Sequence, residues 1–140
     1  SIVDLPYVNT MQAFFLIKAL GGNKVRLFGE EGCGQAVEVL PYWSLRDMED
    51  ASVDLCYNQD SLPEIREDLA RDIIDQVARI TIGGFYSVNQ EGETEVSYLN
   101  GARQLLTPRL VEENGRFERW QRNIYWIRKG FVEEFHTVRR

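Results

Sequence analysis

The feature that most constrains the fold is an amphipathic helix between two strand-like segments. Residues 66–80 place large apolar side chains at intervals of four, four and three residues: Leu69, Ile73, Val77 and Ile80. This spacing is typical of a helix that packs one face on a core. Runs of β-branched and aromatic residues lie before and after it, at 53–57 and 85–89. A strand, a helix and a strand in this order predict two parallel strands joined by a crossover.

The rest of the chain continues this alternation. Further elements are expected in these segments: 1–5, 24–28, 36–40, 117–127 and 131–138 as strands, and 8–20 and 46–50 as helices. The last two strands flank Lys129-Gly130 and predict an antiparallel hairpin, whereas residues 96–110 give no clear pattern. The sequence therefore predicts one α/β domain over residues 1–140, with a mostly parallel sheet, helices on both faces and an antiparallel C-terminal hairpin.

Composition narrows the class of protein. Apolar residues make up 44% of the chain, which is enough for a sizeable core, and no apolar run approaches the roughly 18–20 residues of a membrane span. A net charge of −6 argues against a general nucleic-acid binder or a ligand of anionic membranes. Two cysteines and the lack of a visible secretory signal favour the reducing cytoplasm, without a disulfide framework or a metal site.

The clearest candidate site follows the strand at 53–57. Four polar residues stand at its carboxyl end: Asn58, Gln59, Asp60 and Ser61. In an open α/β sheet, ligands bind outside the carboxyl ends of the strands. Ser61 and Glu64 have the spacing of a capping box, with Pro63 between them, which predicts that the next helix begins there. The sequence therefore predicts chemistry at this strand tip.

The order of four motifs resembles class I methyltransferases that depend on S-adenosylmethionine. These motifs are SIVDLP at 1–6, VDLCYNQDSLPEI at 53–65, GGFYSVNQ at 83–90 and GFVEEFHTV at 130–138. More narrowly, the chain is similar to sugar O-methyltransferases. Members of that group carry a strand-end IDLP element before an aromatic-rich helix, and an Asn/Asp-Ser-x-x-Glu element after the fourth strand. The resemblance covers nearly the whole chain, and the order of the motifs carries most of it.

The resemblance implies a cofactor site for S-adenosylmethionine. Asp4 matches the acid at the end of the second strand that binds the ribose hydroxyls, since one carboxylate can accept both hydrogens. The alternative for Asp4 is a turn residue before Pro6. The adenine site is expected near Glu30 or residues 40–43, and Trp43 could stack on adenine or belong to the core.

At the fourth strand, the resemblance implies that Asn58 and Gln59 face the methionine part of the cofactor. Asp60 is the first candidate for the base that takes a proton from the hydroxyl of a sugar or similar acceptor. Glu64 is better explained as a structural acid. His136 is the single histidine, and a packed strand residue is favoured over a second candidate base.

The sequence departs from the family in one respect. The Gly-rich first motif, which lets the backbone approach the cofactor, is missing, and the glycines at 29, 32 and 34 follow a different strand. The strand order of the fold is 3-2-1-4-5-7-6, so the missing first strand belongs in the middle of the sheet. The chain is therefore expected to be part of a longer enzyme, and its incomplete sheet could make it self-associate.

Two other hypotheses remain open. A non-catalytic interaction or regulatory module could retain the fold without the cofactor loop. Another Rossmann-like enzyme, such as a nicotinamide-dependent one, is also compatible with alternating strands and helices, although the terminal hairpin argues against it. A partner other than a small-molecule acceptor or a second copy of the chain is not indicated.

Overall fold

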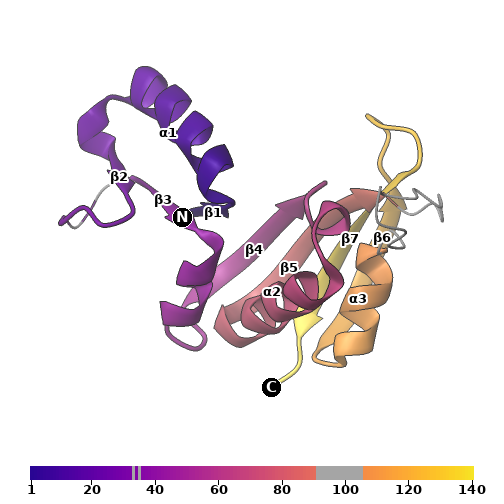
Figure 1. Cartoon of the computed structure of the whole chain (residues 1–140). Helices are drawn as coiled ribbons and strands as arrows, with labels where there is room; N and C mark the ends of the chain where they lie inside the picture. Colours follow the sequence, from indigo (N-terminus) through magenta and orange to yellow (C-terminus); the bar gives the residue numbers. More distant parts are fainter. Residues whose placement is uncertain (33, 35, 91–105) are drawn as a thin grey trace. The chain divides into compact units, whose positions relative to one another are not determined.

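The computed structural model describes residues 1–32, 34, 36–90 and 106–140, which form two compact units (Figure 1). Unit 1 is Ser1–Met48 and unit 2 is Glu49–Arg140. Each unit has its own sheet and its own hydrophobic cluster, and each is described by itself. The single domain expected from the sequence stays a prediction.

Unit 1 is a three-stranded parallel sheet with one helix on it. Its elements are β1 (Ile2–Asp4), α1 (Pro6–Leu20), a 3-10 turn (Gly22–Lys24), β2 (Val25–Leu27), β3 (Val37–Pro41) and a 3-10 segment (Tyr42–Asp47). The sheet order is β1-β3-β2. Pro6 occupies the first turn of α1, where its missing N–H costs nothing, and Gly21 ends the helix with a φ of 91°. Ala13 of α1 packs with Val25 and Val39 of the sheet.

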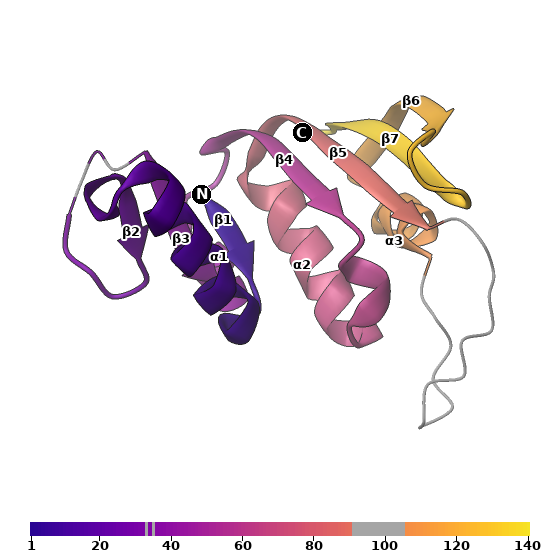
Figure 2. The same ribbon diagram turned by 90° about the horizontal axis from the view of Figure 1, so that it is seen from above.

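Unit 2 is a four-stranded mixed sheet. Its elements are β4 (Val53–Gln59), a 3-10 turn (Leu62–Glu64), α2 (Glu67–Ile80), β5 (Thr81–Gln90), α3 (Thr107–Asn114), β6 (Phe117–Ile124) and β7 (Phe131–Val138). The sheet order is β4-β5-β7-β6; β4 and β5 are parallel, while β7 is antiparallel to both of its neighbours (Figure 2). The carboxyl ends of β4 and β5 therefore lie at the same edge of the sheet as the turn between β6 and β7.

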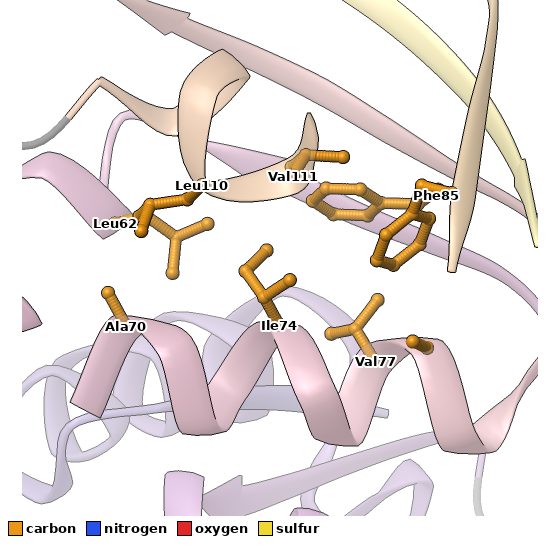
Figure 3. Packing of buried hydrophobic residues seen from close by; sticks show 9 residues of the cluster. Leu62, Ala70, Ile74, Val77, Phe85, Leu110 and Val111 are labelled. Carbon is orange, nitrogen blue, oxygen red and sulfur yellow. The ribbon is translucent and has the colours of Figure 1, made fainter. Parts of the chain in front are cut away.

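One face of this sheet carries the core of unit 2. Apolar side chains of α2 and α3 meet Phe85 and Phe117 of the strands in one cluster, with Ile74 1% exposed among them (Figure 3). The opposite face carries aromatic side chains instead. Tyr57 stacks on Tyr86 with 5.7 Å between ring centroids, and Tyr57 is 57% exposed. Within unit 2, both helices thus cover the same face.

The predicted α/β class, the parallel pair β4–β5 and the C-terminal hairpin are confirmed. The start of β5 differs from the prediction, because Gly83 and Gly84 belong to the strand. A methyl group on Gly84 would lie 2.3 Å from the ring of Phe135, and one on Gly83 would lie 2.6 Å from the carbonyl oxygen of Asp54. These glycines therefore permit close packing within the sheet.

Two predictions of helix boundaries are wrong. No side chain caps α2, which begins at Glu67, and Leu62–Glu64 forms a separate 3-10 turn, so Ser61 and Glu64 are not a capping box. The short helix expected at 46–50 is instead the 3-10 segment at 42–47. Most of the unassigned segment 96–110 lies outside the described residues. In α3, Pro108 occupies the first turn, where proline is well tolerated.

Candidate functional site

A network of side-chain amides and hydroxyls links the carboxyl ends of β4 and β5. The Asn58 amide donates to the Ser61 hydroxyl at 2.6 Å, and its Oδ1 accepts from the Asn89 amide at 3.0 Å. The same Asn89 nitrogen donates to the Ser87 hydroxyl at 2.8 Å. The network orients Asn58, and within the described residues it leaves this amide one N–H and one lone pair without a partner. Asn58 is thus a pre-positioned polar group at the predicted strand tip.

Asn89 is more deeply buried than its partners. It is 1% exposed, its amide nitrogen donates to Asn58 and Ser87, and its Oδ1 has no partner within the described residues. Burying such an acceptor unpaired costs about 1–3 kcal/mol. Asn89 is part of the tip, although it lies on a different strand.

Asp60 has an unusual backbone and an ionic partner. Its φ is 51°, a left-handed conformation that aspartate tolerates better than most residues, and its N–H donates to the carbonyl of Val88 at 3.1 Å. Its Oδ2 forms an ion pair with Arg128 in the turn between β6 and β7. The guanidinium of Arg128 also lies 4.1 Å from the ring centroid of Phe131. Within the described residues, Oδ1 of Asp60 has no hydrogen-bond partner.

Gln59 lies on the other face of β4, because successive strand residues alternate. Its Oε1 accepts a hydrogen bond from the Tyr57 hydroxyl, and its side chain is exposed. Tyr86, which stacks on Tyr57, donates to the carboxylate of Glu133 at 2.7 Å. This bond, with burial, raises the pKa of Tyr86 to about 12. Asn58 and Gln59 therefore offer amides to opposite sides of the strand tip.

Asp4 stands at the carboxyl end of β1 in unit 1. Its Oδ1 accepts from the N–H of Leu5 at 2.7 Å, and its Oδ2 accepts from the Gln12 amide at 2.9 Å. These two bonds fix the carboxylate at the start of α1, and each oxygen keeps a lone pair. The structure thus holds Asp4 in place both as a turn residue and as an oriented acceptor of hydrogen bonds.

The residues proposed for adenine lie on loops of unit 1. Glu30 is exposed and accepts from the N–H of Leu27 at 2.9 Å, so it acts as a turn residue. Trp43 is 42% exposed and meets Phe28 and Tyr42 edge-on, at 6.2 and 5.2 Å between centroids. Its indole is therefore available to a ligand and is not a core residue.

His136 is buried on β7, as the sequence favoured. It is 1% exposed, stacks on Phe85 and lies 3.3 Å from a carboxylate oxygen of Glu134, which is also 1% exposed. Arg122 donates to the other oxygen of Glu134 at 2.5 Å. Burial alone would raise the pKa of Glu134, but the bonds from His136 and Arg122 outweigh burial and lower it.

Sequence reasoning missed two members of the tip, Asn89 and Arg128. Asn89 could have been found, because the parallel pairing of β4 and β5 brings their carboxyl ends to one edge. Arg128 is 68 residues from Asp60, and nothing in the sequence indicates this pairing. Among the described residues, no helix is long and apolar enough to cross a membrane.

No protein-family profile and no curated protein sequence matches this chain. Solved structures do match. LaPhzM has a TM-score of 0.62 and 14% identity, over 98% of this chain and 42% of that one. An O-methyltransferase family protein from Burkholderia thailandensis has a TM-score of 0.58 and 15% identity, over 99% and 42%. The 1,6-didemethyltoxoflavin-N1-methyltransferase of the same organism, with bound S-adenosylhomocysteine, has a TM-score of 0.57 and 11% identity, over 99% and 71%.

The chain has the Rossmann-like methyltransferase fold. At these identities the likeness establishes the fold alone. The chain spans less than half the length of two of these three structures. The activity, substrate and partners of a whole protein of this kind are therefore matters for proposal.

Proposed function

We propose that this chain belongs to an enzyme that transfers a methyl group from S-adenosylmethionine to a hydroxyl of a sugar or a similar small molecule. The observation that carries the proposal is the order of the strands. The order β4-β5-β7-β6 in unit 2 equals 4-5-7-6, the second half of the methyltransferase sheet. In unit 1, β1 and β3 are parallel neighbours. They would correspond to the second and third strands of the methyltransferase sheet, which are also neighbours.

The edges of the two sheets support the proposal that the chain is part of a longer enzyme. β1 is an edge strand of the first sheet, and β4 is an edge strand of the second. These two strands would flank the first strand in the order 3-2-1-4-5-7-6. An unpaired edge strand presents free N–H and C=O groups to another chain. An additional strand from a longer polypeptide could pair with these edges, and a second copy of this chain could pair with them through its own edge strands.

The polar side chains at the two strand ends suit the proposed cofactor. The Asp4 carboxylate keeps a lone pair on each oxygen for ribose hydroxyls, and its position is fixed by Leu5 and Gln12. Asn58 keeps one N–H and one lone pair for the polar end of the methionine part. Gln59 is the second residue proposed for the cofactor, and its exposed amide would approach from the opposite side of the strand tip. S-adenosylhomocysteine is bound in one of the structures that share the fold, which supports the choice of cofactor.

Asp60 is the proposed base. When bound, S-adenosylmethionine supplies an electrophilic methyl group on a sulfonium centre. Asp60 would take the proton of the acceptor hydroxyl at Oδ1 while Arg128 holds Oδ2. The pairing with Arg128 orients the carboxylate, and the bond from the Asp60 N–H to the Val88 carbonyl fixes the backbone of Asp60. Orientation is the main contribution expected of the protein in such a transfer.

A non-catalytic interaction module is the second candidate. The observation that favours it is the aromatic face of unit 2, where Tyr57 and Trp120 are 57% and 73% exposed. Large exposed apolar patches are typical of interaction sites. Such a module would neither bind S-adenosylhomocysteine nor transfer a methyl group, whereas an enzyme would do both.

The test is a methyl-transfer assay on the longest natural polypeptide that contains these residues. Labelled S-adenosylmethionine would be offered with a panel of sugars, nucleotide sugars and small phenols. We expect label in a hydroxyl acceptor, and a loss of about 10²–10⁴-fold in kcat for Asp60→Asn. Asp54→Asn, an exposed position on the same strand, is the matched control and should leave kcat unchanged.

The outcomes separate the parts of the proposal. Normal turnover of Asp60→Asn would remove Asp60 as the base and leave the enzyme assignment intact. If label is transferred only to nitrogen or carbon acceptors, the proposed acceptor, a sugar hydroxyl, is wrong. No transfer and no binding of S-adenosylhomocysteine would favour the non-catalytic module.

A further inference from the structure

The turn between β6 and β7 carries two adjacent basic residues, Arg128 and Lys129. It lies at the edge of the sheet where β4 and β5 end (Figure 2). The segment 123–132 contains these two basic residues and no acidic one, although the chain as a whole has a net charge of −6. Even with the carboxylate of Asp60 beside them, the balance at this turn is positive. The turn is therefore a local positive region next to the proposed base.

Backbone hydrogen bonds order this turn. The N–H of Tyr125 donates to the carbonyl of Phe131 at 3.0 Å. The N–H groups of Arg128 and Phe131 donate to the carbonyls of Tyr125 and Arg128, each at 3.3 Å. Gly130 has a φ of 83°, a conformation that glycine adopts without a steric penalty. The backbone that carries the two basic side chains is therefore set by the turn itself.

The guanidinium of Arg128 is fixed on two sides and open on a third. Nη1 forms the ion pair with Oδ2 of Asp60, and the central carbon lies 4.1 Å from the ring centroid of Phe131. Within the described residues, Nε and Nη2 have no hydrogen-bond partner, and the side chain is 59% exposed. These two nitrogens form the planar fork that binds an oxyanion through two parallel hydrogen bonds. Because Asp60 and Phe131 already orient the guanidinium, little freedom is lost when an anion binds.

Lys129 supplies a second positive charge next to this fork. Its side chain is exposed and has no ionic partner in the part of the chain that the structure describes. An ammonium group on a flexible stem can approach an anion that the neighbouring Arg128 holds. Two positive charges match a phosphate group, which carries about −1.5 to −2 charges at pH 7, better than a singly charged carboxylate. A free sugar has no group that would use either charge.

We propose that the acceptor is a phosphorylated sugar, whose phosphate binds the Nε–Nη2 fork of Arg128 and the ammonium of Lys129. This inference rests on the proposed methyl transfer at Asp60 and names its substrate class. Because Arg128 contacts both groups, it would fix the phosphate relative to the carboxylate that takes the hydroxyl proton. A sugar phosphate and a nucleotide sugar share this chemistry.

Matched acceptors test the proposal in the longest natural polypeptide that contains these residues. Each sugar is offered with labelled S-adenosylmethionine in three forms: free, as the monophosphate and as the nucleoside diphosphate derivative. We expect kcat/KM to be at least about tenfold higher for a phosphorylated form than for the free sugar, because charge-assisted hydrogen bonds to the phosphate are added. The better of the two phosphorylated forms identifies the source of the phosphate.

The outcomes separate this inference from the proposed function. Equal or better transfer to free sugars, or transfer to phenols alone, would overturn the phosphate site and leave methyl transfer intact. No transfer to any acceptor would contradict the proposed function, and this inference with it.

Three variants locate the phosphate site. Arg128→Lys keeps the charge but removes the fork, and it should lower the preference for the phosphorylated acceptor at least about fivefold. Lys129→Gln should lower this preference by about threefold and leave kcat unchanged. Arg116→Gln removes an exposed positive charge at the opposite end of β6 and is the matched control, so the preference should not change. An unchanged preference in Arg128→Lys would refute the site, even if kcat falls because Asp60 is held less well.

The cofactor offers a competing anion, its own carboxylate. Calorimetric titration of S-adenosylhomocysteine into wild type and Arg128→Lys distinguishes the two ligands. We expect equal affinities, because the fork serves the acceptor. A tenfold weaker binding of S-adenosylhomocysteine in Arg128→Lys, with an unchanged preference among acceptors, would assign the fork to the cofactor and overturn the proposal.

Discussion

Removing the side chain of Ile74 should weaken unit 2 strongly. Ile74 is 1% exposed and belongs to the cluster that joins α2, α3 and β5, with Phe85 and Leu110 as other members (Figure 3). Ile74→Ala removes three carbons, and each buried methylene contributes about 0.8 kcal/mol. The transfer loss is thus about 2.4 kcal/mol, and the cavity left behind brings the total to about 3–4 kcal/mol.

Hydrogen exchange at the amides of β5 is the appropriate assay, because it reports the opening of unit 2 alone. A loss of about 3 kcal/mol should speed this exchange roughly 10²-fold. Ile127→Ala is the matched control, since the same atoms are removed at a residue that is 83% exposed. It should change the stability by less than about 0.5 kcal/mol. Similar effects of the two substitutions would refute the assignment of this core.

Two further predictions concern β5 and β7. Gly84→Ala should lower the free energy of unfolding by about 1–3 kcal/mol, because the new methyl group would meet the Phe135 ring; an unchanged urea midpoint would contradict this close approach. The pKa of Glu134 lies below its ordinary value of 4.5, because the bonds from His136 and Arg122 outweigh burial. Its ionised form therefore stabilises the folded state above about pH 4.5, and this stability is lost as the pH falls through the lower folded-state pKa. Urea unfolding between about pH 3 and pH 7 should show a smaller acid loss in Glu134→Gln, and parallel pH curves for the two proteins would contradict it.

The elements with strong local signals could be predicted from the sequence. Apolar spacing in 66–80 indicated α2, and the two alternating segments around Lys129-Gly130 indicated the hairpin of β6 and β7. Both patterns arise because apolar side chains must face one core. The pattern in the sequence therefore corresponds to the buried face in the structure. The boundaries were less accurate, because the Ser61–Glu64 spacing suggested a cap while Ser61 in fact binds Asn58.

The candidate site was predictable only in part. The strand-tip residues could be located, because a run of polar residues directly after a predicted strand is a local pattern. Their partners could not, since Arg128 and Asn89 are brought to Asp60 and Asn58 by the pairing of strands distant in sequence.

The central claim is that this chain contributes a site for S-adenosylmethionine in which Asp4 is an acceptor. It is tested most directly by calorimetric titration of S-adenosylhomocysteine into the longest natural polypeptide that contains these residues. The account predicts saturable binding that Asp4→Asn weakens by at least about tenfold, because a charge-assisted hydrogen bond contributes about 1.5–3 kcal/mol. Binding of equal strength in wild type and Asp4→Asn, or no saturable heat in either protein, would contradict it.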